Sequence, residues 1–322
     1  MLAIQAREAG GPEVLEAVDI PVPLPGPGQI LVRHEAIGLN FIDTYQRSGL
    51  YPVRFPAVLG QEAAGVVEAM GEGVTRFKLG DRVAYAGATG AYSQAHVVAA
   101  ARAVSVPAGV SSEVAAASLL KGMTAEFLLR RCYPVRSGET ILVHAAAGGV
   151  GTIMVQWAKA IGATVIGTVG SQAKAELARS FGCDHVILYR DEDVAKRVRE
   201  LTDGKGVPVA YDSVGKDTFE GTLASLARRG LFVSFGNASG PVPPFPPLRL
   251  SQGGSLYITR PTMGDYTVTT AELDDSAGAL FSMIASGKVK IEIGQRFPLS
   301  ETRKAHEALQ SRDTTGATVL VP

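Results

Sequence analysis

Residues 143–151, Val-His-Ala-Ala-Ala-Gly-Gly-Val-Gly, have the spacing of a backbone turn that binds phosphate groups. The fingerprint of such a turn is Gly-x-Gly-x-x-Gly between a strand and a helix. Gly148 and Gly151 hold its second and third glycine positions, and Ala146 replaces the first. We expect Gly148 to let the backbone approach a pyrophosphate and Gly151 to let the helix pack closely on the strand. Ala146 implies a turn that accepts a small Cβ atom and avoids a positive φ.

The residues after the next predicted strand indicate which dinucleotide the turn binds. NAD-binding proteins place an acidic residue about 20 residues after the turn, where it binds the ribose 2′-hydroxyl and would repel a 2′-phosphate. Here that position is Gly170, followed by Ser171 and Lys174, which offer a hydroxyl donor and a positive charge. Tyr189, after the following strand, could bracket the adenosine with its ring and hydroxyl. The combination predicts NADPH, although Ser171 alone is equally explained as a helix N-cap and Lys174 alone as a solvated residue.

The pattern from residue 139 onward predicts the sheet that would position these side chains. Short apolar runs alternate with amphipathic segments, which is typical of a doubly wound parallel sheet. The expected strands are residues 140–146, 164–170, 185–190, 207–215, 231–237 and 254–259, and the expected helices are residues 151–162, 171–182, 191–202 and 217–230. The glycine turn is thus expected at a strand-to-helix junction, which is the context that the fingerprint requires.

The flanking segments have a different character. Residues 1–120 are predicted to form mainly strands and turns, followed by a helix with Ser112 as its N-cap. The five prolines from Pro241 to Pro247 predict a loop that crosses the mouth of a site, rather than a proline motif for a partner. The C-terminal part, with a helix over residues 269–287 and a final strand, is too short to fold alone and is expected to pack on the first block.

Length and composition limit the possible classes of function. A chain of 322 residues, 46% hydrophobic and 19% charged, is typical of a two-domain globular protein. The formal net charge is zero and no basic stripe occurs, which argues against a nucleic-acid partner. The N-terminus lacks a signal-peptide pattern and no apolar run is long enough to span a membrane, so we expect a cytoplasmic protein. The two cysteines, Cys132 and Cys183, cannot form a disulfide framework, and reduced buried thiols fit that compartment.

Segments spread over nearly the whole chain carry a resemblance to one family. They are GGPEVL, AIGLNFIDTYQRSGLYP, LGQEAAGVVEAMGEGV, GDRVAY, AAASLLKGMTA, HAAAGGVG, YDSVG, RRGLFVSFGNASG, GSLYITRP and SGKVK, in this order. The chain resembles the zinc-independent quinone oxidoreductases (zeta-crystallin type) of the medium-chain dehydrogenase/reductase superfamily. The resemblance implies an α/β fold with a GroES-like β-rich catalytic domain at residues 1–121, completed by residues 264–322. It also implies a Rossmann doubly wound parallel-sheet domain for NADPH at residues 122–263.

The resemblance also concerns metals. Zinc-dependent relatives carry a metal-binding His in a Gly-His-Glu triplet and a Cys at the end of an early strand. Here the triplet is Gly60-Gln61-Glu62, and the early position lies between Asn40 and Asp43. Gln is a poor zinc ligand and no thiolate is near in the sequence, so no metal site is expected. Without a Lewis acid, alcohol oxidation is disfavoured, whereas reduction of an electron-poor acceptor such as a quinone is chemically reasonable.

The same resemblance implies roles for individual residues. It puts Asn40, Asp43 and Tyr45 near the nicotinamide and its ribose, where Tyr45 could donate a proton or a hydrogen bond to a quinone oxygen. Tyr45 could equally be a packed aromatic residue, and Asp43 is expected to orient a ribose or a neighbouring side chain. The further cofactor-binding residues are Thr124, Ala147, Gly149, Val150, Ser213, Phe235, Gly236, Asn237, Arg260 and Arg312, in addition to Gly148, Gly151, Gly170, Ser171, Lys174 and Tyr189.

Two further expectations concern Lys121 and the assembly. Lys121 lies in a segment that resembles a family motif and is expected to form a salt bridge with a nearby carboxylate. The predicted strand at residues 254–259 resembles an edge strand that pairs across a two-fold axis in the superfamily, which implies a homodimer.

Three functions remain open from the sequence. The first is an NADPH:quinone oxidoreductase, and the second is the same fold reducing enones, 2-alkenals or enoyl thioesters. The third is an NADPH-binding protein with a structural or RNA-binding role and negligible turnover. Zero net charge and the intact glycine turn count against the third.

Overall fold

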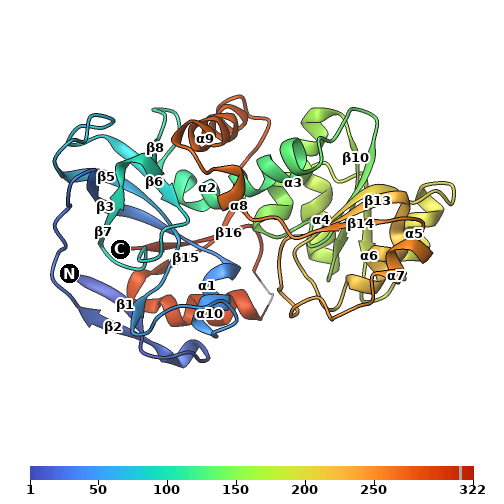
Figure 1. The fold of residues 1–322 in the computed structure, drawn as a ribbon, viewed down its shortest axis with the longest axis horizontal. Coiled ribbons are helices and arrows are strands. Elements are labelled where there is room, and N and C mark those ends of the chain that lie inside the picture. The colour runs from blue at the N-terminus through green and yellow to red at the C-terminus, as the bar shows by residue number, and fades with distance from the viewer. Residues whose placement is uncertain (312–313) are drawn as a thin grey trace. The chain divides into compact units, whose positions relative to one another are not determined.

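The structure is a computed structural model that describes residues 1–311 and 314–322. The chain forms two compact units (Figure 1). Each unit has its own apolar core. Unit 1 contains Met1–Met123, Thr267–Ser286 and Ile291–Pro322, and unit 2 contains Thr124–Tyr266 and Gly287–Lys290. None of the helices in the described residues is both long enough and apolar enough to cross a membrane.

Unit 2 is built on a six-stranded parallel sheet with the strand order β11-β10-β9-β12-β13-β14. The strands are β9 (Thr140–Val143), β10 (Thr164–Val169), β11 (His185–Leu188), β12 (Val207–Asp212), β13 (Leu226–Ser234) and β14 (Tyr257–Thr259). The direction in which the chain adds strands reverses between β9 and β12, and doubly wound sheets bind ligands at this point. The predicted doubly wound parallel sheet is confirmed.

Helices connect these strands. They are α3 (Gly149–Ile161), α4 (Gln172–Ser180), α5 (Val194–Leu201) and α6 (Phe219–Ser225). Because crossovers between parallel strands are right-handed, α3 and α4 cover one face of the sheet and α5 and α6 the other. Gly162 ends α3 with φ 95°, and its N–H donates to the carbonyl oxygens of Ala158 and Lys159. A residue with a side chain would adopt this torsion at a cost, which explains the glycine.

The interpretation of residues 217–230 as one helix is wrong at its C-terminal end. α6 stops at Ser225, and the chain turns directly into β13 at Leu226, which pairs with Val207 of β12. Burial explains the difference, because Leu226 is 1% exposed and belongs to the apolar core of unit 2. Tertiary packing therefore overrides the helix-forming composition of the Leu-Ala-Arg-Arg segment.

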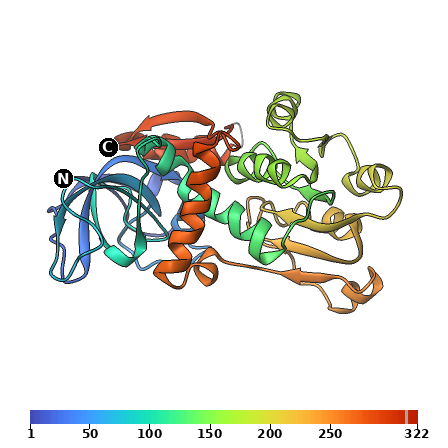
Figure 2. The same cartoon turned by 90° about the horizontal axis from the view of Figure 1, so that it is seen from above.

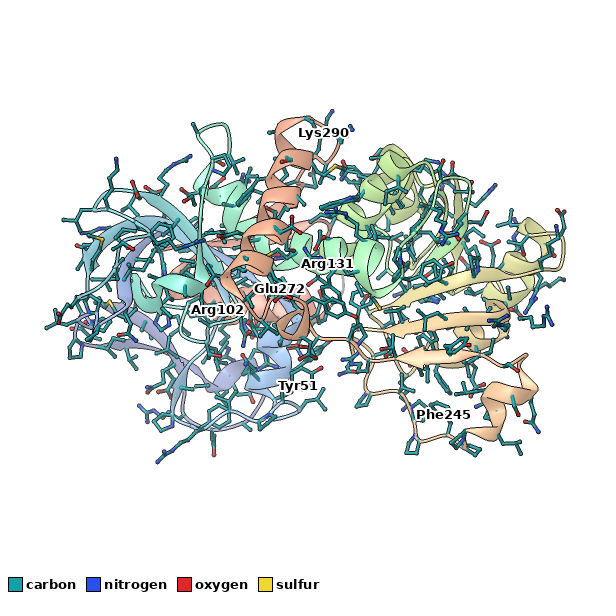
Figure 3. The ribbon with its side chains drawn as sticks, turned by 45° about the horizontal axis from the view of Figure 1, so that its top comes forward. Tyr51, Arg102, Arg131, Phe245, Glu272 and Lys290 are labelled. Carbon is teal, nitrogen blue, oxygen red and sulfur yellow. The ribbon has the colours of Figure 1, made fainter. Side chains whose placement is uncertain are left out.

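The segment between β13 and β14 contains the prolines. Phe245 lies among them and packs against Phe219 of α6, with ring centroids 5.1 Å apart. Figure 3 labels Phe245 in the same part of the ribbon as α7 (Leu248–Gln252). Pro247 directly precedes α7, where its missing N–H costs no helical hydrogen bond. The short α8 (Met263–Tyr266) follows β14, and the expected position of this proline segment at the mouth of a site stays a prediction.

Unit 1 contains two sheets. The larger has the order β15-β16-β3-β5-β6-β8 with β7 also paired to β3, and the smaller has the order β2-β1-β4. The strands are β1 (Leu2–Ala6), β2 (Leu15–Asp19), β3 (Gln29–Leu39), β4 (Ala57–Val58), β5 (Glu62–Met70), β6 (Arg82–Ala86), β7 (Ala95–Ala99), β8 (Ala103–Ser105), β15 (Ile293–Pro298) and β16 (Ala317–Val321). β16 pairs with β3, so the expected packing of the C-terminal part on the first block is confirmed.

Among the described residues, four α-helices accompany the sheets of unit 1. They are α1 (Phe41–Arg47), α2 (Ser112–Phe127), α9 (Thr270–Ala285) and α10 (Thr302–Gln310), and α2 continues into unit 2. Figure 2 shows α9 alongside the strands of unit 1, where it contacts β8. The expected helix near the C-terminus is therefore confirmed as α9. α1, in contrast, falls in a stretch that the sequence predicted as strands and turns.

The N-cap of α2 also differs from the expectation. Ser111, rather than Ser112, accepts a hydrogen bond from the N–H of Val114, at 3.2 Å. Ser112 is the first residue of the helix, and its hydroxyl donates to the carboxylate of Glu35. Either serine has the chemistry of an N-cap, and the carboxylate of Glu35 on β3 accounts for the different use of Ser112.

Candidate cofactor site and active site

The residues expected at the cofactor follow the carboxyl ends of the strands of unit 2. All strands of a parallel sheet end at the same edge, and this edge is where such sheets bind ligands. The glycine turn follows β9, Gly170 and Ser171 follow β10, Tyr189 follows β11, Ser213 follows β12, Phe235, Gly236 and Asn237 follow β13, and Arg260 follows β14. Residues that are scattered in the sequence therefore share one edge of the sheet.

Space, rather than backbone torsion, explains the glycines of the turn. Gly148 is the N-cap of α3 with φ −84°, a torsion open to any residue. A Cβ atom at Gly151 would lie 2.2 Å from the carbonyl oxygen of Ala145, so only glycine lets α3 approach the end of β9 this closely. A Cβ atom at Gly148 would have that same oxygen as its nearest neighbour, at 3.2 Å. A Cβ atom at Gly148 would therefore make a tight contact with this oxygen without overlapping it, and Gly148 itself is partly exposed, as a turn that receives a pyrophosphate requires.

Ala146 replaces the first glycine without strain. The positive φ of the turn lies one residue earlier, at Ala145, with φ 52°. Ala146 is fully buried, and a Cβ atom built on Gly167 of β10 would lie 2.7 Å from the Ala146 methyl carbon. A glycine in the neighbouring strand thus provides the room that an alanine in the turn needs.

Gly170 and Tyr189 lie side by side at the ends of β10 and β11. A Cβ atom at Gly170 would lie 2.7 Å from the hydroxyl oxygen of Tyr189. Ser171 is the N-cap of α4, where its side-chain oxygen accepts a hydrogen bond from the N–H of Lys174 at 3.4 Å. The N-cap explanation for Ser171 is confirmed, but that bond does not use its hydroxyl hydrogen, which can donate to an anion. Lys174 lies in the first turn of α4, where the helix dipole also favours negative charge.

The loops after β12, β13 and β14 contact each other. A Cβ atom at Gly236 would lie 2.3 Å from the carbonyl oxygen of Ser213, so these two loops meet through their backbones. Arg260 Nη1 donates to the carbonyl oxygen of Gly236 at 3.1 Å. The structure thus brings Ser213, Gly236 and Arg260 together, and Phe235 and Asn237 flank Gly236 in the same loop.

A buried polar network supports this edge. Asp212 Oδ1 accepts hydrogen bonds from the N–H groups of Val214 and Gly215, at 2.7 and 3.1 Å. Asp212 Oδ2 accepts a hydrogen bond from the hydroxyl of Thr222 at 3.2 Å, and the Thr222 oxygen lies 2.9 Å from His144 Nε2. Burial lowers the pKa of His144, which favours the neutral ring. The network fixes the turn after β12. No local sequence pattern indicates it, because His144, Asp212 and Thr222 lie in three segments that are far apart in the chain.

The expected active-site residues of unit 1 lie at the start of α1. Asn40 is the N-cap of α1, and its backbone N–H donates to Asp43 Oδ2 at 2.9 Å. Tyr45 lies in the same helix, is 9% exposed, and packs edge-on against Tyr51 with ring centroids 5.3 Å apart. Tyr45 is therefore a packed aromatic residue, and its role in the chemistry stays a prediction.

Asp43 is a fully buried acid. Its Oδ2 also accepts a hydrogen bond from the hydroxyl of Tyr92 at 2.8 Å, whereas Oδ1 has no hydrogen-bond partner among the described residues. Burial raises the pKa of Asp43 to about 7, although the hydrogen bonds from Tyr92 and Asn40 and the charge of Lys121 act to lower it. The charge of Glu62 adds to the rise. Asp43 therefore changes charge near neutral pH, a property that the sequence did not indicate.

Lys121 forms the salt bridge that the sequence predicted. Its Nζ atom lies 3.1 Å from Glu62 Oε2, and both side chains are buried. Glu62 Oε2 also accepts a hydrogen bond from Asn40 Nδ2 at 2.9 Å, and Oε1 accepts one from the N–H of Leu120 at 2.6 Å. Glu62 therefore links the N-terminus of α1 to α2 through three donors.

The donor set around Gln61 does not fit a zinc ion. Gln61 Nε2 donates to Thr89 Oγ1 at 3.1 Å, and the neighbouring Glu62 carboxylate is occupied by Lys121 and by amide donors. Zinc sites use thiolate, imidazole and carboxylate ligands that are available to the metal. Over residues 1–311 and 314–322, no group of three or more His, Cys, Asp or Glu side chains is placed to hold a metal ion.

The remaining expected residues are placed as follows. Ala147 precedes the N-cap of α3, and Gly149 and Val150 form the first turn of that helix. Thr124 lies in α2 and is the first residue of unit 2. Arg312 lies outside the described residues.

Comparison with known proteins agrees with this arrangement. Residues 149–275 match the family model described as zinc-binding dehydrogenase, and residues 26–130 match the alcohol dehydrogenase GroES-like domain. A quinone oxidoreductase of Pseudomonas aeruginosa is 58% identical over 321 residues, which cover 99% of each chain. The chain belongs to the zeta-crystallin-type quinone oxidoreductase family. The description of the family model for residues 149–275 names zinc, but the Gly60-Gln61-Glu62 triplet of this quinone oxidoreductase family member does not fit a zinc ion.

Two further relatives of this family member are informative. The solved structure of Escherichia coli quinone oxidoreductase complexed with NADPH is 51% identical, has a TM-score of 0.99, and is matched over 100% of both chains. The 2-haloacrylate reductase of a Burkholderia species is 43% identical over 330 residues, which cover 100% of this chain and 99% of the relative. The quinone oxidoreductase family fold therefore occurs in relatives named for two different acceptors.

Proposed function

We propose that this chain is an NADPH:quinone oxidoreductase that transfers a hydride from NADPH to a quinone without a metal ion. The observation that carries the proposal is the edge of the unit 2 sheet, where a glycine turn after β9 is followed by Gly170 after β10, at the position of the acidic residue of NAD-binding sheets. Family membership supports the activity, and the Escherichia coli relative solved with NADPH supports the cofactor.

The cofactor half of the proposal assigns the two phosphate regions. Gly148, which is partly exposed, and the N-terminus of α3 bind the pyrophosphate. Ser171 and Lys174 bind the 2′-phosphate through a hydroxyl donor and a positive charge, and Tyr189 brackets the adenosine. The rest of the proposed cofactor site is formed by Thr124, Ala147, Gly149, Val150, Gly151, Gly170, Ser213, Phe235, Gly236, Asn237, Arg260 and Arg312.

The chemical half of the proposal concerns α1. When bound, NADPH supplies the hydride that reduces the acceptor. The hydroxyl of Tyr45 donates a proton or a hydrogen bond to the acceptor oxygen that gains negative charge. Asn40 orients the nicotinamide ribose, and the fully buried Asp43 holds Asn40 in place through its backbone N–H. The reduction of a quinone to a hydroquinone takes up one hydride and one proton. Tyr45 supplies that proton, or solvent supplies it where Tyr45 only donates a hydrogen bond.

A second candidate function is the reduction of an activated carbon–carbon double bond. The observation that favours it is the 43% identity to a protein named 2-haloacrylate reductase. Both functions use the same cofactor and differ in the acceptor, so the cofactor assignment above holds for either. A non-enzymatic or RNA-binding role has no specific observation in its favour, and the zero net charge argues against it.

The proposal includes a homodimer in the cytoplasm. β14 is the last strand of the unit 2 sheet, and Tyr257 at its start is 56% exposed. An exposed edge strand is commonly protected by pairing with a second copy across a two-fold axis. Both cysteines are free thiols, which fits a reducing compartment.

Turnover with different acceptors tests the proposed reaction. NADPH oxidation is measured with 1,4-benzoquinone and 9,10-phenanthrenequinone, then with an enone and a 2-alkenal, each with and without EDTA. We expect the quinones to give the highest kcat/KM and EDTA to have no effect. Higher kcat/KM for the 2-alkenal would favour the second function, and loss of turnover in EDTA would contradict the metal-free reaction. Tyr45→Phe is expected to lower kcat more than it changes the Kd for NADPH.

A further inference from the structure

A row of buried side chains connects α10 to Asp43 within unit 1. His306 of α10 is fully buried, and its Nδ1 lies 3.1 Å from Arg47 Nη1. Its Nε2 lies 2.9 Å from the hydroxyl oxygen of Tyr92, whose hydroxyl donates to Asp43 Oδ2 at 2.8 Å. Arg47 and Tyr92 are buried as well, so water does not compete for these hydrogen bonds.

Arg47 determines the direction of every hydrogen bond in the row. A guanidinium group only donates, so His306 Nδ1 must accept. Burial, together with the charge of Arg47, lowers the pKa of His306 to about 3, so the ring is neutral at physiological pH and its single hydrogen is on Nε2. Nε2–H then donates to the oxygen of Tyr92, which leaves the hydroxyl hydrogen of Tyr92 for Asp43.

The row orients hydrogen bonds and does not deliver protons. Arg47 is held by its Nε atom, which donates to the carbonyl oxygen of Gly10 at 3.1 Å, and by Nη2, which donates to Gln310 Oε1 at 3.0 Å. Arginine does not release its proton at physiological pH. His306 therefore cannot be resupplied from that end, and the row acts as a fixed set of donors that ends on Asp43.

A second buried tyrosine–histidine pair of unit 1 has the opposite direction. His34 Nδ1 lies 2.7 Å from the carbonyl oxygen of Ser93, which can only accept, so Nδ1 carries the hydrogen. His34 Nε2 then accepts the hydroxyl hydrogen of Tyr85, at 2.9 Å. The tyrosine–histidine distance is the same as at His306, but the Tyr85 hydroxyl is not directed to a carboxylate. The pair is a matched control for the loss of a buried tyrosine hydroxyl.

Asp43 joins the row to the start of α1. Its Oδ2 accepts the Tyr92 hydroxyl and also the backbone N–H of Asn40, the N-cap residue. An ionised carboxylate at this position stabilises the first turn of the helix. The other charged groups that act on Asp43 are Lys121, which favours the ionised form, and Glu62, which opposes it.

We infer that His306 is a positioning residue: through Tyr92 it directs a hydrogen bond to Asp43, favours the ionised carboxylate, and so fixes the first turn of α1, which carries Asn40 and Tyr45. The inference rests on the proposed function, because Asn40 and Tyr45 are assigned to the reaction there. It adds three residues, Arg47, Tyr92 and His306, that do not touch the reacting atoms.

Titration of Asp43 in the cofactor-free protein tests the inference directly. The carboxyl infrared band is followed with pH and assigned by its loss in Asp43→Asn. Tyr92→Phe should raise the titration midpoint by about one pH unit, because a hydrogen bond to the charged form is lost. His306→Leu should also raise it, whereas His306→Gln, which keeps an acceptor for Arg47 and a donor for Tyr92, should stay near wild type. The control Tyr85→Phe should leave the midpoint unchanged.

The pH profile of quinone reduction provides the functional measurement. The acidic limb of kcat/KM should move to higher pH in Tyr92→Phe and His306→Leu, with about a fivefold loss of kcat/KM at pH 7 for Tyr92→Phe. His306→Gln should recover most of the activity that His306→Leu loses.

An unchanged Asp43 midpoint in both Tyr92→Phe and His306→Leu overturns the inference. If His306→Gln and His306→Leu lose kcat/KM equally while the Asp43 midpoint stays at the wild-type value, the role of His306 is purely structural and the inference is overturned too. If His306→Leu does not fold, Tyr92→Phe against His306→Gln gives the same comparison. If the variants shift the Asp43 midpoint but the wild-type protein reduces no acceptor, the proposed function is contradicted. The inference that the row controls the ionisation of Asp43 then still holds.

Discussion

The hydroxyl oxygen of Tyr189 lies 2.7 Å from the point that a Cβ atom at Gly170 would occupy. Any side chain at position 170, including the acidic one that NAD-binding sheets use, therefore requires Tyr189 to move. Tyr189 is 36% exposed, so it can move toward solvent. Compared with NAD-binding sheets, this position has no carboxylate and has the phenol of Tyr189 instead. Both differences favour a phosphate on the adenosine ribose.

Substitutions at position 170 separate the effect of bulk from the effect of charge. Gly170→Ala adds only the Cβ atom that displaces Tyr189, and it should weaken NADPH and NADH binding to a similar, small extent. Gly170→Asp adds a charge that repels the 2′-phosphate and accepts from a 2′-hydroxyl, so it should reverse the preference toward NADH. The Kd of each cofactor is measured by quenching of protein fluorescence. If the ratio of the Kd for NADPH to the Kd for NADH is the same in Gly170→Ala and Gly170→Asp, the assignment of the 2′-phosphate site to this position is contradicted.

Lys174 should contribute to NADPH binding alone. Removal of its charge in Lys174→Ala should raise the Kd for NADPH about 10- to 100-fold, the usual value of a hydrogen bond to a charged group, and leave NADH nearly unchanged. Lys205→Ala is the control, because Lys205 is an exposed lysine that precedes β12 and so lies toward the opposite edge of the sheet. A similar loss in both variants, or a parallel loss of NADH binding in Lys174→Ala, would show a general charge effect instead.

Substitution of the two glycines of the turn should have different effects. In Gly151→Ala the new methyl group overlaps the Ala145 carbonyl oxygen, so the free energy of unfolding should fall by about 1–3 kcal/mol. In Gly148→Ala the methyl group would lie 3.2 Å from the same oxygen, a tight contact without overlap, so stability should fall less than in Gly151→Ala while the Kd for NADPH rises about tenfold or more. Urea unfolding and cofactor titration of both variants check this. A wild-type Kd for NADPH in Gly148→Ala would contradict the assignment of this turn as the pyrophosphate-binding site.

Asp43 should make the protein less stable as the pH rises toward neutrality. Burial raises its pKa to about 7, whereas an unfolded chain has about 3.9. Between these values the folded protein keeps a proton that the unfolded chain has released, so the contribution of Asp43 to stability falls by about 1.4 kcal/mol per pH unit. Asp43→Asn lacks this titration. Its free energy of unfolding relative to wild type should rise from pH 5 to pH 7 and level off above, and a difference independent of pH would argue against a raised pKa.

Local patterns account for the parts of the fold that the sequence predicted. The glycine turn, the N-cap role of Ser171 and the C-terminal glycine of α3 each depend on residues a few positions apart. The overextended helix at residues 217–230 shows the limit of such patterns, since the burial of Leu226 in the core decided where α6 ends. α1 was missed because it has only seven residues and is stabilised by the Asn40–Asp43 contact and by burial, not by helix-forming composition.

The polar networks could not be predicted for a different reason. Tyr92 is 49 residues from Asp43 and 214 residues from His306 in the sequence, and only the fold brings the three together. Each residue alone is an ordinary core aromatic, acid or histidine. The Lys121–Glu62 salt bridge was anticipated only as a pairing with some carboxylate, because the partner lies on another element.

The comparison of NADPH with NADH as reductants of 1,4-benzoquinone tests the central claim most directly. The steady-state kcat/KM of each cofactor is measured at a fixed, saturating quinone concentration. The account predicts rapid turnover with NADPH and a kcat/KM at least about tenfold higher than with NADH, in line with one charge-assisted contact to the 2′-phosphate. Equal or higher kcat/KM with NADH would contradict the role of Gly170, Ser171 and Lys174, and no quinone reduction despite tight NADPH binding would contradict the proposed reaction.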